Sequence, residues 1–335
     1  SGVGRREGRE GDGMDYVKER LYKEAKLSQN EEVDLLFGGS PCQSFSTAGK
    51  RQAFDDPRGK AMLKFADLVN EVQPKVFLLE NVRGLLSSAL KHVPIKERKS
   101  TKLKPDEQPG SALRYLISFF KDYKVKVKLL NAADYGVPQT RERVFIVGVR
   151  KDLNISYEFP EATHDREGKN GKKPWRKVNE VLNGINVTKH NHLNYSAERL
   201  KWMKLIPKGG GNWRDLRKYG EETVKEAMAG AYNSGGGKVG FFRRIDVNKP
   251  SPTLLTSPMQ KSTNLGHPYE DRPLSIEEYL AIQGFPENFF VAGSLTQQYA
   301  QIGNAVPIQL AYALGKSIVN MLNELEEIKH ESVIW

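Results

Sequence analysis

The sequence has few of the residues that build covalent or metal-held frameworks. Cys42 is the single cysteine among 335 residues, so no disulfide can form within the chain, and a cysteine-based zinc site has little support. The six histidines include no HExxH pair, which argues against metal catalysis, and we expect no metal site. A lone thiol is typical of the reducing interior of a cell, and we expect a cytoplasmic protein.

Long apolar runs are also missing. No stretch of about 18 apolar residues occurs, as a membrane-spanning helix would need, so we expect no membrane partner. The first eight residues, SGVGRREG, lack the apolar segment of a secretory signal. The hydrophobic share of 38% still predicts that most of the chain folds, as one large or two medium domains.

Positive charge is what the sequence has in excess. The chain carries 52 Lys and Arg against 41 Asp and Glu, a formal net charge of +11. An excess of this size favours a polyanionic partner, of which nucleic acid is the most common. The alternative, a basic surface that is merely solvated, is equally compatible with the charge alone.

Short apolar segments alternate with amphipathic ones in the first 150 residues. This alternation predicts an open α/β sheet with helices on both faces. Residues 88–110 are charged and contain prolines, which predicts a surface insertion. We expect strands at 33–37, 76–79, 124–130 and 144–149, and helices at 61–72 and 111–120.

From residue 151 the composition changes. Glycine, lysine, arginine, asparagine and tryptophan are frequent up to about residue 270 and the periodicity is weak, which predicts a second, loop-rich domain. Helical signals return with the capping box Ser275–Glu278 and with an amphipathic segment at 307–325.

Cys42 stands in the loop GGSPCQSFS (38–46), directly after the first predicted buried strand. Ligands of open α/β sheets bind outside the carboxyl ends of the strands, so a thiol on this loop is placed as an exposed nucleophile that acts as its thiolate. The alternative is a small buried hydrophobic residue, which is the most common state of a free cysteine.

Charged residues flank two other predicted strands. Glu80 follows the strand at 76–79 and is a candidate proton donor, with a capping or loop carboxylate as the alternative. Arg141 and Arg143 precede the strand at 144–149 and are two residues apart, so they point the same way in an extended chain. A fixed guanidinium can bind an anion or a carbonyl oxygen at two points; the alternative is a solvated pair.

Five motifs in a fixed order are far more specific than any one of these residues. Between about Val33 and Asn323 the chain resembles the DNA cytosine-5 methyltransferases. The motifs that carry the resemblance are PCQ (41–43), ENV (80–82), QTRER (139–143), RPLS to QGFP (272–286) and GNAVP (303–307).

The resemblance implies a reaction and roles for the residues. The family transfers a methyl group from S-adenosylmethionine to C5 of a cytosine that is flipped out of duplex DNA. The Cys42 thiolate is expected to add to C6, Glu80 to hold and protonate N3, and Arg141 to hold the O2 side of the ring. Arg143 is expected to support the loop. The family further implies a prokaryotic, nucleoid-associated restriction-modification enzyme that acts as a monomer on DNA.

The resemblance also implies binding positions. Gln43 and Ser44 are expected to contact the flipped nucleotide or its phosphate. Arg243 and Arg244 are candidates for phosphate or guanine contacts, with a surface charge pair as the alternative. The basic loop 208–214, which contains a tryptophan, is a further candidate for contact with a groove of the DNA. The expected cofactor-binding residues are Asp12, Pro41, Asn304, Ala305 and Val306.

The implied architecture is a Rossmann-like methyltransferase sheet, incomplete at its N-terminus, at 1–153 plus 287–335. A target recognition domain with its helical support is expected at 154–286. The family begins with a strand and an FxGxG turn that cradles the cofactor, whereas here 32 residues precede Val33 and the opening SGVG echoes that turn without the strand. We therefore expect a truncated sequence, unrecorded residues, or one part of a split enzyme whose second chain supplies the motif.

The incomplete cofactor motif predicts that the isolated chain binds S-adenosylmethionine weakly. A low-micromolar dissociation constant by calorimetry would contradict this prediction. One alternative function is a catalytically silent DNA-binding fragment. Another is a tRNA cytosine-5 methyltransferase, which is disfavoured by the Gln-Ser that follows Cys42 and by the sizeable recognition region.

Overall fold

The computed structural model describes most of the chain, and the described residues divide into two compact units. The sheet unit comprises the residues up to Leu130, 142–159 and those from Ser317 onward, and the loop-rich unit comprises 131–141 and 160–316. Described are residues 14–28, 31–39, 57–94, 97–99, 102–185, 190–233, 240–260 and 264–333, with the side chains of 14–16, 57–58 and 329–333 excepted.

These units differ in two respects from the domains expected from the sequence. The expected boundary after residue 153 lies close to the observed one after Phe159, but residues 131–141 and 287–316, both expected in the catalytic domain, belong to the loop-rich unit. For residues 287–316 the reason is packing, since helix α8 (Leu295–Asn304) and helix α7 (Ile276–Gln283) share one apolar cluster.

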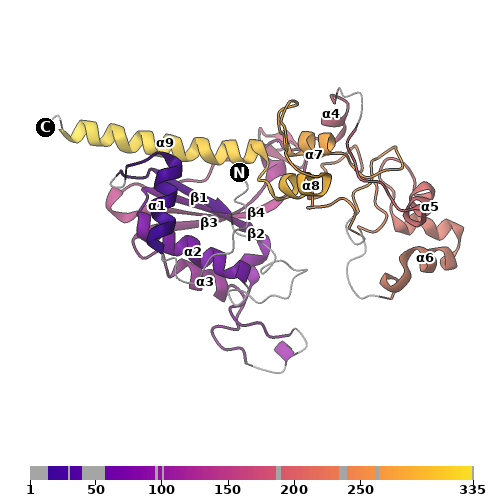
Figure 1. Ribbon diagram of the computed structural model, residues 1–335, viewed down its shortest axis with the longest axis horizontal. Helices are drawn as coiled ribbons and strands as arrows, with labels where there is room; N and C mark the ends of the chain where they lie inside the picture. The colour runs from indigo at the N-terminus through magenta and orange to yellow at the C-terminus, as the bar shows by residue number, and fades with distance from the viewer. Residues whose placement is uncertain are drawn as a thin grey trace. The chain divides into compact units, whose positions relative to one another are not determined.

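Four strands form the sheet of the sheet unit, in the order β1-β2-β4-β3 (Figure 1). β1 runs parallel to β2, and β2 runs antiparallel to β4, so the sheet is mixed. This confirms the α/β fold class, and the strands lie where the apolar segments predicted them. Their bounds are β1 (Leu35–Gly39), β2 (Val76–Val82), β3 (Tyr123–Asn131) and β4 (Glu142–Arg150).

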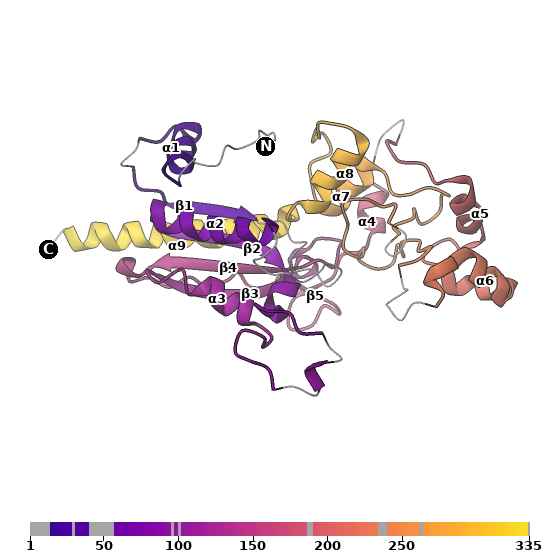
Figure 2. The ribbon, with the colours of Figure 1, turned by 60° about the horizontal axis from the view of Figure 1, so that its bottom comes forward.

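Both faces of this sheet are covered by helices (Figure 2). Phe77 and Leu79 of β2 pack with α2 (Pro57–Val72) and α3 (Ser111–Ile117). Val76, whose side chain points the opposite way in the strand, packs instead with Ile318 and Met321 of α9 (Ile308–Val333). Continuous apolar segments are required in such strands because both of their faces are buried.

The remaining elements of the sheet unit are short helices and a charged surface segment. No described residue between 91 and 110 is buried, and Lys91 pairs with Asp106 at 2.9 Å, so this part of the predicted segment 88–110 lies at the surface, whereas Ala89 is buried. The other elements are α1 (Met14–Ala25) and the 3-10 helices η3 (Arg83–Ser87), η4 (Glu97–Lys99) and η6 (Lys151–Leu153).

The loop-rich unit has short elements around two apolar clusters. One cluster surrounds α7 and α8, and the other gathers the buried side chains of α5, η7 and α6, among them Trp202 and Trp213. The predicted capping box is present, with Ser275 and Glu278 bonding to each other's backbone N–H. The further elements are η5 (Ala132–Tyr135), β5 (His164–Asp165), β6 (Lys173–Pro174), α4 (Asn179–Leu182), α5 (Ala197–Leu205), η7 (Trp213–Tyr219), α6 (Glu221–Met228) and η8 (Ala229–Ala231).

None of the helices in the described ranges combines the length and apolar character that a membrane span requires.

Candidate active site

Glu80 and Arg143 form an ion pair near the carboxyl end of β2. Arg143 Nε donates to Glu80 Oε1 at 2.9 Å, and the two side chains are 13% and 18% exposed. Arg143 Nη1 also donates to the carbonyl of Glu142 at 2.8 Å, which fixes the direction of the guanidinium. The structure thus brings together two of the residues expected at the active site, and both are partly exposed.

The end of β1 makes room for this ion pair. Gly39 is the register partner of Glu80, and a Cβ atom at Gly39 would lie 3.2 Å from Glu80 Oε2. At Gly38 a Cβ atom would lie 2.8 Å from the ring of Phe65, which is closer than real Cβ atoms approach. The two glycines therefore let the strand that precedes Cys42 lie against both the helix and the carboxylate.

Arg141 belongs to the loop-rich unit and has different partners. Its side chain is 1% exposed, and its terminal nitrogens donate to the carbonyls of Leu254 at 3.0 Å and Gly303 at 2.7 Å. Buried carbonyl groups need such donors, so Arg141 joins the segment around residue 254 to the end of α8.

Two buried amides extend this clamp, and their roles were not foreseen from the sequence. Gln139 Nε2 donates to Gln283 Oε1 at 3.0 Å, and its own Oε1 accepts from the backbone N–H of Leu254 at 3.0 Å. Gln283 Nε2 donates to the carbonyl of Ile302 at 2.6 Å. Both residues lie in the motifs at 139–143 and 272–286, but a single sequence carries no signal that their side chains are buried.

The expected cofactor contacts at 304–306 lie at the end of α8. Asn304 is the last residue of the helix and is exposed, while Ala305 and Val306 are half-buried. A Cβ atom at Gly303 would lie 2.4 Å from the carbonyl oxygen of Leu255, so this position requires a glycine.

Arg244 is not available for DNA, which corrects the expectation from the sequence. Its side chain is 1% exposed and donates to the carbonyls of Met203, Ile206, His267 and Glu270 and to the carboxylate of Asp271. The guanidinium is therefore saturated by the protein and holds the segments that surround it. Sequence alone could not separate Arg244 from its neighbour Arg243, which is half-buried.

The expected groove-binding loop at 208–214 is corrected in part. Trp213 is 7% exposed and packs in the apolar cluster of α5 and α6, so its ring cannot meet a groove. Asn212 caps η7 through a capping box with Asp215, which orders the end of the loop. Arg214 remains exposed beside the Trp213 ring, with its guanidinium carbon 5.2 Å from the ring centroid.

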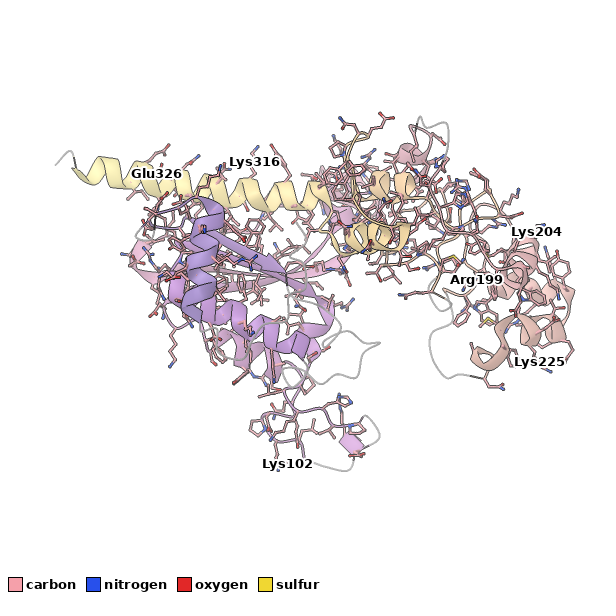
Figure 3. All side chains as sticks on the ribbon, viewed as in Figure 1. Lys102, Arg199, Lys204, Lys225, Lys316 and Glu326 are labelled. Carbon is pink, nitrogen blue, oxygen red and sulfur yellow. The ribbon has the colours of Figure 1, made fainter. Side chains whose placement is uncertain are left out.

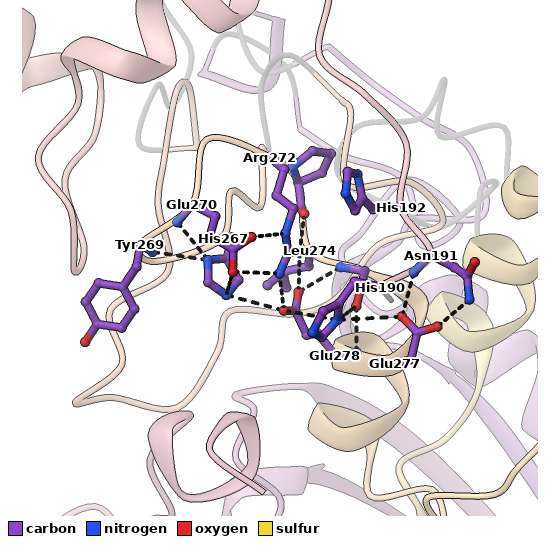
Figure 4. A network of polar contacts seen from close by, with 12 residues as sticks. His190, Asn191, His192, His267, Tyr269, Glu270, Arg272, Leu274, Glu277 and Glu278 are labelled. Carbon is purple, nitrogen blue, oxygen red and sulfur yellow. Dashed lines mark hydrogen bonds and ion pairs between the residues drawn. The ribbon is translucent and has the colours of Figure 1, made fainter. Parts of the chain in front are cut away.

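A buried polar network supports the motif at 272–286 (Figure 4). Arg272 donates to both oxygens of Glu278, at 2.7 and 3.0 Å, and Glu278 also accepts from the backbone N–H of Ser275. His267 Nε2 lies 3.3 Å from Glu278 Oε1. Burial lowers the pKa of His267, with the nearby carboxylates acting in the opposite direction.

Five predicted site residues lie outside the described residues. They are Asp12, Pro41, Cys42, Gln43 and Ser44. Within the described ranges no group of three or more His, Cys, Asp or Glu side chains could hold a metal ion.

Comparison with known proteins gives a consistent result. The family model of the C-5 cytosine-specific DNA methylases matches residues 14–320. The Type II methyltransferase M.Sau96I of Staphylococcus aureus is 40% identical over 88% of the chain and 62% of its own length. The Type II methyltransferase M.PspPI of Psychrobacter sp. (strain TA137) is 39% identical over 88% of the chain and 65% of its own length. The chain thus spans about two thirds of the length of these relatives.

A solved structure supports the same assignment. A protein encoded within an E. coli prophage, and proposed to be a DNA modification methyltransferase, is 25% identical with a TM-score of 0.55. The similarity covers 91% of this chain and 83% of that protein.

Proposed function

Because the chain belongs to the C-5 cytosine-specific DNA methylases, we propose that it methylates C5 of a cytosine flipped out of duplex DNA, through a covalent adduct with Cys42. The observation that carries this proposal is the Glu80–Arg143 pair. It lies at the carboxyl end of β2, beside the strand that leads to Cys42. Open α/β sheets bind their ligands at this edge.

Cys42 is separated from the end of β1 by only a few residues of sequence. Gly39 is the register partner of Glu80, and Cys42 follows Gly39 by three residues. An extended chain of three residues spans at most about 11 Å, and we propose that the thiol and Glu80 meet the same cytosine ring. The nucleophile and the proton donor can then act on one ring.

The proposed chemistry uses these residues in sequence. The Cys42 thiolate forms a bond to C6, and the electron pair moves toward N3, which Glu80 protonates. C5 thereby becomes nucleophilic and takes the methyl group from the sulfonium of the donor, whose carbon–sulfur bond breaks and whose sulfur keeps the electron pair as a thioether. A base then removes the C5 proton, the C6–sulfur bond breaks to release the thiolate, and N3 returns its proton to Glu80, which restores the aromatic ring.

The geometry supports a change in the roles of the two arginines. From sequence, Arg141 was expected at O2 of the ring and Arg143 in support of the loop. Arg143 is instead the group that lies against Glu80, while Arg141 donates to two backbone carbonyls. We assign the O2 contact to Arg143 and the clamp to Arg141.

The proposed methyl donor is S-adenosylmethionine, which supplies an electrophilic methyl group when bound. Asn304 is exposed at the end of α8, and its amide offers both a donor and an acceptor, which suits the amino and carboxylate groups at the methionine end. The half-buried Ala305 and Val306 would border the same end. The described residues thus fit one part of such a pocket.

A covalent trap tests the proposal. Duplex DNA with 5-fluorocytosine has no C5 proton to lose, so the adduct should persist through denaturing electrophoresis in the presence of S-adenosylmethionine. We expect an adduct with the wild-type chain and none with Cys42→Ala. The assay should be run with and without an added N-terminal segment of a relative. Absence of a Cys42-dependent adduct in both arms would reject the chemistry and favour a silent DNA-binding fragment.

A site completed by a further strand is the second candidate, and the edge of β1 favours it; in a split enzyme a second chain would supply that strand. Within the described part of the chain β1 pairs only with β2, and Phe37 of β1 is 72% exposed. A parallel strand with an open edge and an exposed aromatic side chain is a template for a further strand. We propose that this strand comes from a cofactor-binding segment, supplied by the same or a second chain. If the segment added in trans restores neither S-adenosylmethionine binding nor the adduct, this candidate fails.

A comparison of substrates distinguishes the proposed DNA methyltransferase from the tRNA methyltransferase alternative. Methyl transfer to duplex DNA and to tRNA should be measured side by side, and we expect transfer to DNA. Transfer to tRNA alone would reverse the assignment.

A further inference from the structure

Two arginines of the loop-rich unit stand apart from the others. Most buried and half-buried arginines there have a carboxylate or two carbonyls as partners; these are Arg141, Arg176, Arg244 and Arg272. Arg199 and Arg243 have no carboxylate partner in the described ranges, and Arg243 makes no hydrogen bond there through its side chain. Both are half-buried.

Arg243 is a desolvated cation without compensation. Its Nε atom is shielded from solvent and has no hydrogen-bond partner within the described residues. Burial lowers the pKa of Arg243, and no neighbouring carboxylate opposes this effect. A buried charge without a partner destabilises a protein, so its presence indicates a ligand that compensates it.

The backbone beside Arg243 is strained. Phe242 has a φ of 44° in the left-handed region, which a bulky side chain rarely adopts, while its ring is buried in the cluster with Trp202 and Trp213. Strain of this kind persists where packing enforces it, and it is common at ligand-binding positions. The buried ring thus fixes the backbone from which Arg243 extends.

Arg199, labelled in Figure 3, lies over the ring of Tyr195, which packs against the same buried cluster. Its Nη1 donates to the carbonyl of Met259 at 2.6 Å, and its guanidinium carbon lies 5.8 Å from the centroid of the Tyr195 ring. Asn264 Nδ2 donates both to the Tyr195 hydroxyl and to the carbonyl of Arg243, each at 3.3 Å. The Asn264 amide therefore joins the backbone of Arg243 to Tyr195, the ring beside Arg199.

We propose that Arg199 and Arg243 bind phosphates of the DNA backbone and so seat the loop-rich unit on its substrate. This inference rests on the proposed function. A guanidinium matches a phosphate in two-point geometry, and a guanidinium that is already desolvated and ordered loses less on binding. The net charge of +11 favours such a partner. Phosphate contacts fix register and orientation without reading sequence.

The test is the salt dependence of DNA binding by the full chain. Arg199→Gln and Arg243→Gln, singly and together, should be titrated with several unrelated duplexes between about 50 and 200 mM salt. Each substitution should weaken binding about tenfold on every duplex. Each should also reduce the slope of log K against log salt by about 0.9, and the double variant by about twice that.

Arg176→Gln is the matched control. It removes the same charge from the same unit, but Arg176 has its own carboxylate, Glu180, at 3.1 Å. The slope should therefore stay at the wild-type value. A second readout is thermal unfolding of Arg243→Met, whose melting temperature should equal or exceed that of the wild type, because an uncompensated charge is removed.

Other outcomes overturn the inference. A wild-type chain that binds DNA while both variants keep its slope would reject the inference alone and leave the proposed function intact. A loss confined to one duplex would assign the arginines to base contacts. A lowered melting temperature of Arg243→Met would assign Arg243 to the fold. A wild-type chain that binds no DNA would reject both the inference and the proposed function.

Discussion

The sheet unit and the loop-rich unit are stabilised in different ways. Of the twelve polar or charged residues that are buried in the described chain, ten belong to the loop-rich unit and only Asn81 and Ser111 to the sheet unit. Strands satisfy their own backbone groups, whereas irregular segments leave carbonyls that need other donors. The buried arginines and glutamines of the loop-rich unit supply them, so a residue type that suggests DNA binding also stabilises the fold there.

The largest effect is expected for Glu80→Gln in the sheet unit, which should lower the rate of methyl transfer without lowering stability. Glu80→Gln keeps the size of the side chain but removes the proton donor, so methyl transfer should fall by about 10²- to 10⁴-fold. The free energy of unfolding should change little, because the glutamine oxygen can still accept from Arg143 Nε. Single-turnover rates and urea unfolding measure the two quantities. A rate within threefold of wild type would contradict the assigned role.

The next prediction concerns the saturated arginine of the loop-rich unit. Arg244→Met removes a buried guanidinium and leaves Asp271 and several carbonyls without their donor. The free energy of unfolding should fall by about 3–5 kcal/mol. Arg243→Met is the neighbouring control, and urea unfolding should show no loss for it. Equal losses at both positions would remove the distinction between the two residues.

Arg141 and Arg143 provide a sharper test of the two units. Arg143→Lys should mainly lower the rate of methyl transfer. A lysine ammonium lacks the planar set of donors with which one guanidinium can bind both the Glu80 carboxylate and O2 of the cytosine ring. Arg141→Lys should mainly lower stability, by about 1–3 kcal/mol, since a buried carbonyl loses its donor. Parallel kinetics and thermal unfolding of both variants measure this. The opposite pattern would restore the roles expected from the sequence.

A smaller effect should depend on pH. The pKa of His267 is lowered in the folded state, so between that value and the unfolded value of about 6.5 the unfolded chain binds more protons. Its contribution to stability should be complete above about pH 6.5 and should be lost as the pH falls through the folded pKa. His267→Gln should flatten this part of the profile of unfolding free energy against pH. An unchanged slope would contradict the role of the histidine.

The smallest expected effect is at the surface of the sheet unit. Lys126 pairs with Glu158, and both side chains are exposed. Lys126→Gln should change the free energy of unfolding by no more than about 1 kcal/mol, since solvent screens the pair. A larger loss in urea unfolding would mean that polar pairs also stabilise the sheet unit substantially, which would weaken the contrast between the two units.

Much of the fold could be predicted from local patterns. The apolar segments at 76–79 and 144–149 lie within β2 and β4, and the Ser275 capping box begins α7, because periodicity and capping act over a few neighbouring residues. The ordered motifs around Glu80 and Gln139 identified the family, and the family model confirmed it. What local patterns could not give is the environment of side chains that the fold brings together from distant segments.

The adjacent residues Arg243 and Arg244 illustrate what the sequence predicts and what depends on the tertiary structure. The sequence alone determined the sheet strands, the single thiol and the order of the motifs. Only the tertiary structure decided that Arg244 is enclosed by carbonyls from Met203 to Glu270 while Arg243 stays half-buried and without a carboxylate. The reason is physical, since burial and hydrogen bonding of a charged group depend on chain segments that no local pattern specifies.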